Sequence, residues 1–227
     1  MGMTSMTDDA RMACLEGMRT AIFDMDGTIL DSMGEWRRRN AEYIRRQGIE
    51  PTAEQRAQMM QLTGRAVVLY YQEQFGFTTD FDTLCADATG RMEAEYRRGL
   101  PQKPGAEAYL RRLRARGVLC VVATATPEPM ARMALERAGL APLLDHIFSV
   151  GMIGGGKGEA DFYDRLAGML GVDKAGCVMF EDAVYAMRGA REAGLTVVGV
   201  TDGTNTSWRA QMQEVCDVII DSFDELP

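Results

Sequence analysis

The chain has 227 residues, of which 46% are hydrophobic and 26% charged, and this is enough to bury one large core or a core with a smaller inserted domain. The formal net charge of -8 argues against a nucleic-acid or membrane-surface binder, since either would need a basic face. Five scattered cysteines without a Cys-x-x-Cys pair are typical of reduced thiols, and we predict a cytoplasmic protein. The sequence has no signal-peptide pattern and no stretch of transmembrane length.

The sequence starts with a polar leader, residues 1–18, that we predict to be poorly ordered. An apolar strand from Thr20 to Phe23 follows and leads directly into Asp24, Asp26 and Gly27. Positions i and i+2 of a strand share a face, so a turn at Gly27 would let both carboxylates project from the carboxyl end of the strand. Open α/β sheets place their active sites at that end.

Two carboxylates this close repel each other unless a cation holds them or one of them carries a proton. With Mg²⁺ bound, one carboxylate can attack phosphorus while the other gives a proton to the leaving group and later takes one from water. The competing interpretation is a solvated turn, because Asp and Gly are common turn residues. The pair favours metal-assisted phosphoryl transfer over that interpretation.

Residues 32–104 differ from the rest of the chain in their hydrophobic pattern, because their apolar residues fall at helical spacing instead of in strand-like runs. The clearest apolar stripe consists of Phe81, Leu84, Cys85, Ala88, Met92 and Tyr96. We interpret it as the inner face of a small helical domain that is inserted after the first strand and lies over the site. The arginine clusters of this segment are expected to be mainly solvated helix faces.

Two residues of this inserted segment are candidates for contacting a substrate. Trp36 begins the first predicted helix, and Arg65 follows a Thr63–Gly64 loop that is expected over the site. Arg65 would recognise a second anionic group on the substrate. The alternative for Arg65 is a solvated arginine at a helix start.

From Pro104 onward helices and strands alternate, which is the pattern of a parallel sheet with helices on its faces. The strands predicted after this point are 118–123, 147–150, 177–180, 197–200 and 218–220. With the strand before Asp24 they make a doubly wound, Rossmann-like α/β sheet of about six strands. The predicted domains are a core of residues 19–31 and 105–227 and a helical cap of residues 32–104.

A threonine stands at the end of the second predicted strand, where the fold would bring it near Asp24. The hydroxyl of Thr124, together with the backbone N–H of Ala125, can hold a phosphoryl oxygen. The alternative is a helix N-cap, a role that fits Thr126 before Pro127 better than it fits Thr124. Thr126 is also a candidate for binding a second phosphate group of the substrate, one that is not transferred.

A lysine and two acids complete the set of polar residues near predicted strand ends. Lys157 lies in a glycine-rich loop that can bring its ammonium to phosphate oxygens. Glu181 and Asp182 follow the strand 177–180 and supply the further acids that a Mg²⁺ site needs. The alternatives are a solvated loop lysine and a pair of acids at a helix start.

Taken in order, the Asp24–Thr28 run, Thr124, Lys157 and the Glu181–Asp182 pair resemble the four motifs of the haloacid dehalogenase (HAD) superfamily. The resemblance spans residues 20–202 and includes the words Phe-Asp-Met-Asp-Gly-Thr-Ile-Leu-Asp-Ser and Phe-Glu-Asp-Ala. The chain is similar to the branch with a helical cap after the first motif, which contains phosphoglycolate phosphatase-like and β-phosphoglucomutase-like enzymes. Departures at positions 158 and 183 remove no catalytic group.

The resemblance implies a Mg²⁺-dependent phosphatase that forms an aspartyl-phosphate. It makes Asp24 the nucleophile and Asp26 the general acid and then base, with Thr124 and Lys157 on the phosphoryl oxygens. The magnesium ligands that it implies are the Asp24 carboxylate, the Asp26 main-chain carbonyl, Asp182 and, directly or through water, Glu181. The substrate would be a small phosphorylated metabolite, a sugar phosphate or a phosphoglycolate-like or nucleotide-type ester, bound by a monomer or weak homo-oligomer.

Three other functions stay open on the sequence. A β-phosphoglucomutase-like mutase, which returns the phosphoryl group to a sugar, shares the same core motifs. Residues 151–158 nearly spell a nucleotide-binding P-loop, but Gly158 replaces the Ser or Thr that ligates Mg²⁺. The third is a phosphate-binding protein that kept the motif residues without catalysis.

Overall fold

The computed structural model describes residues 13–59, 62, 65–201 and 208–227, and its described part contains one parallel sheet with the strand order β3-β2-β1-β4-β5-β6. The strands are β1 (Thr20–Phe23), β2 (Leu119–Thr124), β3 (His146–Ser149), β4 (Cys177–Glu181), β5 (Thr196–Val200) and β6 (Val218–Ile220). Each predicted strand is present, with ends shifted by at most one residue. The predicted doubly wound α/β fold is therefore confirmed.

Strand β1 is central in the sheet, with Thr20 opposite Leu119 of β2 on one side and Cys177 of β4 on the other. Its side chains alternate between two hydrophobic cores, because successive residues of a strand point to opposite faces. Phe23 belongs to one core and Ile22 to the other, and both are fully buried. The strand is apolar throughout because both faces are covered.

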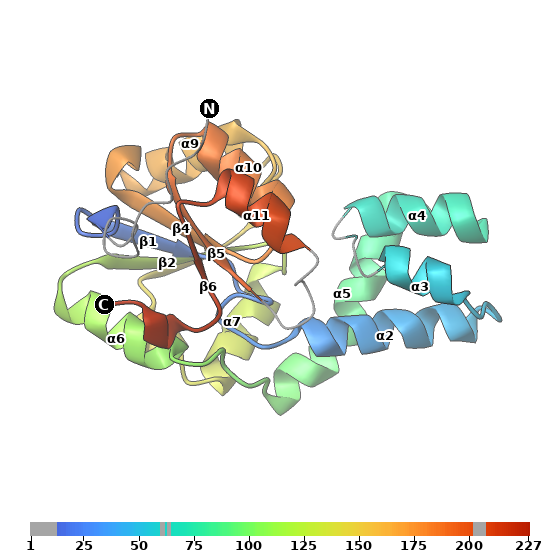
Figure 1. Ribbon diagram of the computed structural model, residues 1–227. Helices are drawn as coiled ribbons and strands as arrows, with labels where there is room; N and C mark the ends of the chain where they lie inside the picture. Colours follow the sequence, from blue (N-terminus) through green and yellow to red (C-terminus); the bar gives the residue numbers. More distant parts are fainter. Residues whose placement is uncertain (1–12, 60–61, 63–64, 202–207) are drawn as a thin grey trace.

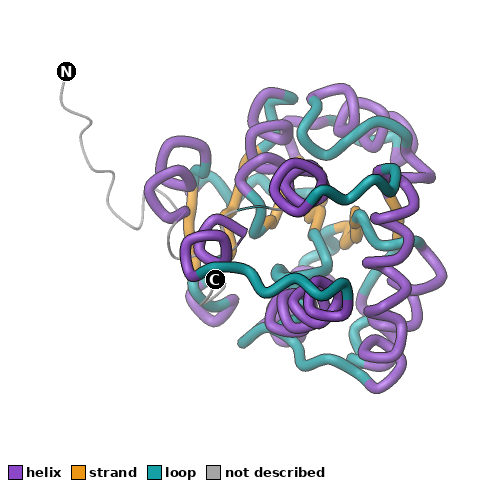
Figure 2. The backbone as a smooth tube through the Cα atoms, turned by 90° about the vertical axis from the view of Figure 1, so that its right-hand side faces the viewer, coloured by secondary structure: helices purple, strands orange, loops and turns teal. Residues whose placement is uncertain are grey.

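Helices cover both faces of the sheet (Figures 1 and 2). One core contains residues of α6 (Ala106–Ala115) and α7 (Glu128–Arg137). The other contains residues of α9 (Ala160–Leu170), α10 (Val184–Glu192) and α11 (Arg209–Val215). The short helix α8 (Val150–Ile153) follows β3, and short 3-10 turns cover 141–143, 174–176 and 223–225.

The segment between β1 and α6 is helical, as predicted, and consists of α2 (Met33–Arg46), α3 (Ala53–Met59), α4 (Arg65–Phe75) and α5 (Phe81–Arg98). Figure 1 shows these helices gathered beside the sheet. The two chain connections to the sheet run next to each other: the N–H of Asp31 donates to Pro101 at 2.9 Å, and that of Lys103 to Ile29 at 3.0 Å. The division into a core and a cap stays a prediction.

The end of the leader lies within the described part of the chain. Residues 1–12 lie outside the described part, but Leu15 and Met18 are buried in the core that contains α6 and α7. Two apolar side chains in a polar leader were too few to predict packing. The last part of the leader thus packs on the core, while the order of residues 1–18 stays a prediction.

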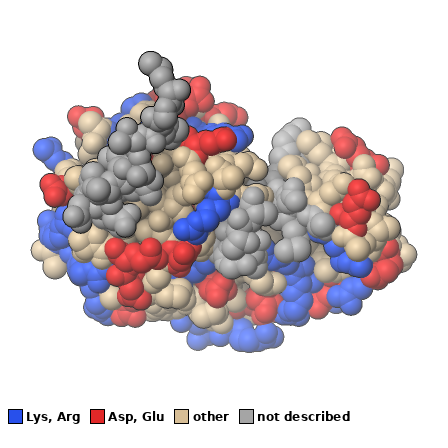
Figure 3. Space-filling model, in the orientation of Figure 1, with Lys and Arg blue, Asp and Glu red and all other residues tan. Residues whose placement is uncertain are grey.

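The arginines of the inserted segment are only partly solvated. Glu95 on α5 is buried and forms ion pairs with Arg38 at 3.1 Å, with Arg98 at 2.6 Å and with Arg39. Arg38 and Arg39 hold α2 against α5 through this carboxylate, but Arg38 and Arg98 are exposed, so the prediction of mainly solvated helix faces is wrong only for Arg39. Over the face shown in Figure 3, basic and acidic side chains are interspersed. No helix within the described residues combines the length and the apolar character needed to cross a membrane.

Candidate active site

The first acidic residue of the site continues the line of β1. The N–H of Asp24 donates to the carbonyl of Phe180 in β4 at 2.9 Å, so the backbone pairing of β1 with β4 extends to this residue. The chain then turns at Gly27, whose φ of 82° lies in the left-handed region that favours glycine. The turn is closed by the Gly27 N–H, which donates to Leu30 at 2.9 Å. This is the predicted turn at the carboxyl end of the strand.

The Asp24 carboxylate is buried and meets a buried ammonium. Lys157 lies with its Nζ 2.5 Å from Asp24 Oδ1 and 2.6 Å from Glu181 Oε2. Glu181 turns its other oxygen, Oε1, to the backbone N–H groups of Asp182 and Ala183, both at 3.0 Å. Glu181 therefore both holds the start of the segment before α10 and pairs with the lysine.

The loop that carries Lys157 is held by helix α10. A Cβ added at Gly189 would lie 2.3 Å from the Lys157 carbonyl oxygen, so the backbone of α10 packs directly on the loop. Lys157 itself is buried. In a P-loop the lysine stands at the start of the helix and faces phosphates. Here helix α9 begins only at Ala160, and the ammonium of Lys157 pairs with two carboxylates. The loop therefore differs from a P-loop in both respects.

The acidic residues suit a hard divalent cation. Asp24, Glu181 and Asp182 each offer a carboxylate oxygen, and these oxygens lie within 4.8 Å of one another. One ammonium cannot neutralise three buried carboxylates, and oxygen donors of this kind are those that Mg²⁺ prefers. Gly27 makes room for the cluster, because a Cβ there would lie 2.3 Å from Asp182 Oδ2. The residues present therefore fit a Mg²⁺ ion.

Burial dominates the protonation of these acids. It raises the pKa of Asp24 from 3.8 to about 8, although Lys157 acts in the opposite direction. Burial, together with the charge of Glu181, also raises the pKa of Asp182 well above its ordinary value. Burial alone would lower the pKa of Lys157, but the charges of Asp24 and Glu181 outweigh it and raise that pKa, so the lysine stays charged.

We expect the metal-free protein to lose stability as the pH rises from about 4, the unfolded pKa of an aspartate, to about 8, the folded pKa of Asp24. The folded state holds the proton of Asp24 up to a pKa of about 8, whereas an unfolded aspartate loses it near 4. This contribution to stability is therefore complete below the unfolded pKa and lost as the pH rises through the folded one. Thermal unfolding in EDTA measures it, with Asp24→Asn as the control in which the decline is smaller, because Asp182 still contributes to it. A melting temperature that is flat or rises with pH in the wild type would contradict the expectation.

The second acidic residue faces different partners from the first. Asp26 accepts from the Tyr96 hydroxyl at 2.9 Å (Oδ1) and 2.8 Å (Oδ2), and Thr126 Oγ1 donates to Oδ2 at 2.8 Å. Its side chain is outside the group of carboxylates around Lys157. The Asp26 carboxylate is thus held by two hydroxyl groups, whereas the Asp24 carboxylate faces the Lys157 ammonium.

The loop after β2 has another arrangement than predicted. Thr124 Oγ1 accepts the N–H of Thr126 at 3.1 Å, which leaves the Thr124 hydroxyl hydrogen available to another acceptor, and Ala125 is exposed between them. Helix α7 takes Pro127 as its N-cap, so Thr126 is not the cap that the sequence indicates. The Thr126 hydroxyl donates to Asp26, so it does not face an open site for a second phosphate group.

Tyr96 is the functional residue that the sequence did not indicate, because its place in an apolar stripe predicts only packing. It is buried at the end of α5, and burial together with the charge of Asp26 raises the pKa of its hydroxyl, which therefore keeps its proton. Trp36, the predicted substrate contact, packs against the same hydrophobic core that contains Tyr96. Residue 65 begins α4, but its side chain and the preceding Thr63–Gly64 lie outside the described part.

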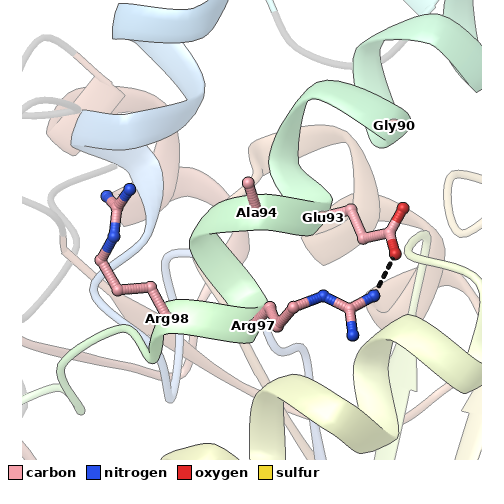
Figure 4. A pocket seen from close by; sticks show the side chains of 5 residues that line it. All are labelled: Gly90, Glu93, Ala94, Arg97 and Arg98. Atoms are coloured by element: carbon pink, nitrogen blue, oxygen red, sulfur yellow. Dashed lines mark hydrogen bonds and ion pairs between the residues drawn. The ribbon is translucent and has the colours of Figure 1, made fainter.

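A separate hollow lies on α5 within the inserted segment. It has a volume of about 450 Å³ and is lined by Gly90, Glu93, Ala94, Arg97 and Arg98. Figure 4 shows Glu93 and Arg97 paired across one turn of the helix, at 2.5 Å. None of the five lining residues belongs to the group of carboxylates around Lys157, and the hollow is not the predicted site.

Comparison with known proteins agrees with this geometry. Residues 18–194 match the model of a family described as haloacid dehalogenase-like hydrolase. The chain is 28% identical to validoxylamine A 7'-phosphate phosphatase of Streptomyces hygroscopicus subsp. limoneus, over 92% of this chain and 95% of that protein. It is 27% identical to hexitol phosphatase A of Escherichia coli, over 90% and 91% of the two chains. CbbY of Rhodobacter sphaeroides, solved with xylulose-(1,5)bisphosphate, shares the fold with a TM-score of 0.74 at 21% identity over 91% and 95% of the chains.

Proposed function

Because this chain belongs to the haloacid dehalogenase-like hydrolase family, we propose that it is a Mg²⁺-dependent phosphatase that hydrolyses a small sugar phosphate or polyol phosphate through an aspartyl-phosphate. The family match confirms the resemblance that the sequence motifs indicate, and the chain is a phosphoric monoester hydrolase. The observation that carries the mechanism is the buried Asp24 carboxylate, which lies 2.5 Å from Lys157 and beside Glu181 and Asp182.

In the proposed first step, an oxygen of Asp24 attacks phosphorus and the bond between phosphorus and the ester oxygen breaks. Protonated Asp26 gives its proton to that oxygen, and the sugar leaves as an alcohol. Lys157 and the Thr124 hydroxyl stabilise charge on the phosphoryl oxygens. Lys157 also favours the ionised form of Asp24, since it opposes the effect of burial on the Asp24 pKa.

In the proposed second step, Asp26 takes a proton from water, and the water oxygen attacks phosphorus. The bond between phosphorus and Asp24 breaks, and the carboxylate is restored as phosphate leaves. Asp24, Asp182, Glu181 and the main-chain carbonyl of Asp26 would hold Mg²⁺. When bound, the ion supplies positive charge that offsets the clustered carboxylates and the phosphoryl group.

The substrate class rests on the relatives' names and on the inserted helices. Two relatives that match nearly the whole chain are, by their names, phosphatases of a hexitol phosphate and of validoxylamine A 7'-phosphate. Helices α2 and α5 both reach the site through Trp36 and Tyr96 and would exclude water while the aspartyl-phosphate forms. Arg65 stays a candidate for a second anionic group on the substrate.

We expect wild-type protein to release phosphate from a panel of hexitol, hexose and pentose phosphates with Mg²⁺, and to lose this activity in EDTA by about 100-fold or more. The panel also includes phosphoglycolate and a nucleoside monophosphate, so that the ratio of kcat/KM values identifies the substrate class. Excess Mg²⁺ added after EDTA is the control that separates metal loss from unfolding. Phosphate release that EDTA leaves unchanged would contradict the proposed role of the acidic cluster.

The competing mutase is separated by the fate of the phosphoryl group. β-Glucose 1-phosphate is supplied with Mg²⁺, and glucose 6-phosphate and free phosphate are measured together. Free phosphate without glucose 6-phosphate supports the phosphatase. Glucose 6-phosphate in the absence of free phosphate would establish the mutase instead.

A further inference from the structure

We infer that Tyr96 is a positioning residue for Asp26: its hydroxyl, together with that of Thr126, fixes the orientation in which Asp26 transfers protons. This inference rests on the proposed function, because it assigns a partner to the proposed general acid. Tyr96 is on α5 at the end of the inserted segment, Thr126 on the loop after β2 and Asp26 on the turn after β1. Three segments far apart in the sequence thus meet at one carboxylate.

The Asp26 carboxylate needs such a device because little else holds it. Its side chain is only half-buried, so it has room to rotate about its own bonds. Oδ2 receives both hydroxyls, at 2.8 Å each, whereas Oδ1 receives only Tyr96, at 2.9 Å. Oδ1 therefore keeps more of its lone-pair capacity and is the oxygen that would carry the transferred proton.

Tyr96 is itself held from several sides. Its ring is fully buried in the hydrophobic core against which Trp36 of α2 also packs. The preceding residue, Glu95, pairs with Arg38 and Arg39 of α2. The turn of α5 that carries Tyr96 is thus tied to α2, so the tyrosine presents its hydroxyl from a rigid base.

A plain structural role for Tyr96 is the competing explanation, since buried tyrosines generally find a hydrogen-bond partner. The two explanations differ in which substrates a Tyr96→Phe enzyme processes poorly. A general acid matters for an alkyl phosphate, whose alcohol is a poor leaving group, and little for an aryl phosphate whose phenolate leaves without a proton. Structural damage to the site would slow both esters alike.

The experiment compares kcat/KM of wild type and Tyr96→Phe on sorbitol 6-phosphate and on 4-nitrophenyl phosphate, both with Mg²⁺. This parameter reports the steps up to release of the alcohol, where Asp26 acts as an acid. We expect a loss of about tenfold or more on the alkyl ester and less than about threefold on the aryl ester. Thr126→Val removes the other hydroxyl and is expected to give the same selectivity.

Two controls separate a specific effect on Asp26 from general damage to the protein. Tyr109→Phe removes the hydroxyl of another buried tyrosine, which packs against Phe180 and Phe223 in the core, and is expected to leave both esters unaffected. In an Asp26→Asn background, Tyr96→Phe is expected to have no further selective effect, because its target is gone. Equal losses on both esters, or an unchanged Tyr96→Phe enzyme, would overturn the inference while wild-type activity upholds the proposed function. A wild type inactive on both esters would refute the proposed function itself.

Discussion

Asp24→Asn is expected to lower kcat for phosphate release by at least about 1,000-fold, the largest effect of any single substitution in this chain. The amide is nearly the same size as the carboxylate, but it lacks the charge and the nucleophilic oxygen that attack phosphorus. Asp24 is buried and its Oδ1 lies 2.5 Å from Lys157, so no neighbouring solvent molecule can easily take over the attack. The measurement is phosphate release with Mg²⁺ on the best substrate of the panel.

The matched control for this substitution is Asp31→Asn, which changes an exposed aspartate seven positions further along the same motif. Asp31 uses its backbone N–H to join the two connections of the inserted segment, and this contact does not involve its carboxylate. We expect the control to keep its activity within about threefold. An Asp24→Asn enzyme that retains more than a tenth of the wild-type kcat would show that another residue is the nucleophile.

Lys157→Met is expected to lower kcat by about 100-fold or more and to destabilise the metal-free fold by about 3 kcal/mol. The substitution removes the ammonium that lies 2.5 Å from Asp24 and 2.6 Å from Glu181, and leaves three buried carboxylates facing one another. Methionine keeps a long flexible side chain, so the loss of charge is separated from the loss of packing.

Mg²⁺ distinguishes two roles of this lysine. If Lys157 both balances charge and binds phosphoryl oxygens, Mg²⁺ will restore much of the stability of Lys157→Met but little of its activity. Thermal unfolding and phosphate release, each with Mg²⁺ and with EDTA, measure the two effects. Lys174→Met, at a partly exposed lysine paired with Asp164, serves as the control. Full recovery of activity with the ion would contradict a contact between the lysine and the phosphoryl group.

The fold was predictable because its strands are short, apolar and separated by clear helix signals. Phe23 and Ile22 occupy opposite cores, yet both are apolar, so β1 appears in the sequence as one unbroken hydrophobic run. Glycines at the ends of helices allowed most helix boundaries to be predicted within a few residues. Leu15 and Met18 escaped prediction because two apolar residues show no period, and their packing depends on helices that lie far along the chain.

The core of the candidate site was also predictable, because each of its charged residues follows a predicted strand or lies in a glycine-rich loop. Asp24, Lys157, Glu181 and Asp182 come together as the parallel sheet requires. Tyr96 was not predictable, since helical spacing gives the face of a residue but not the partner of its hydroxyl. Thr126 was misassigned for the related reason that a local signal, threonine before proline, competes with a contact to the distant Asp26.

The pairing of β1 also has a consequence for how the chain assembles during synthesis. Thr20 pairs with Leu119 and with Cys177, so β1 leaves the ribosome well before either neighbour exists. Long sequence separation between partners slows folding and exposes an apolar strand to aggregation in the meantime. Helices α2 to α5, whose contacts are more local, can form during this interval. The two ends of the inserted segment are joined by hydrogen bonds from Asp31 to Pro101 and from Lys103 to Ile29. Once these bonds form, the chain that leads to β2 starts close to the end of β1. The inserted helices would thereby shorten the effective loop that the central strand must close.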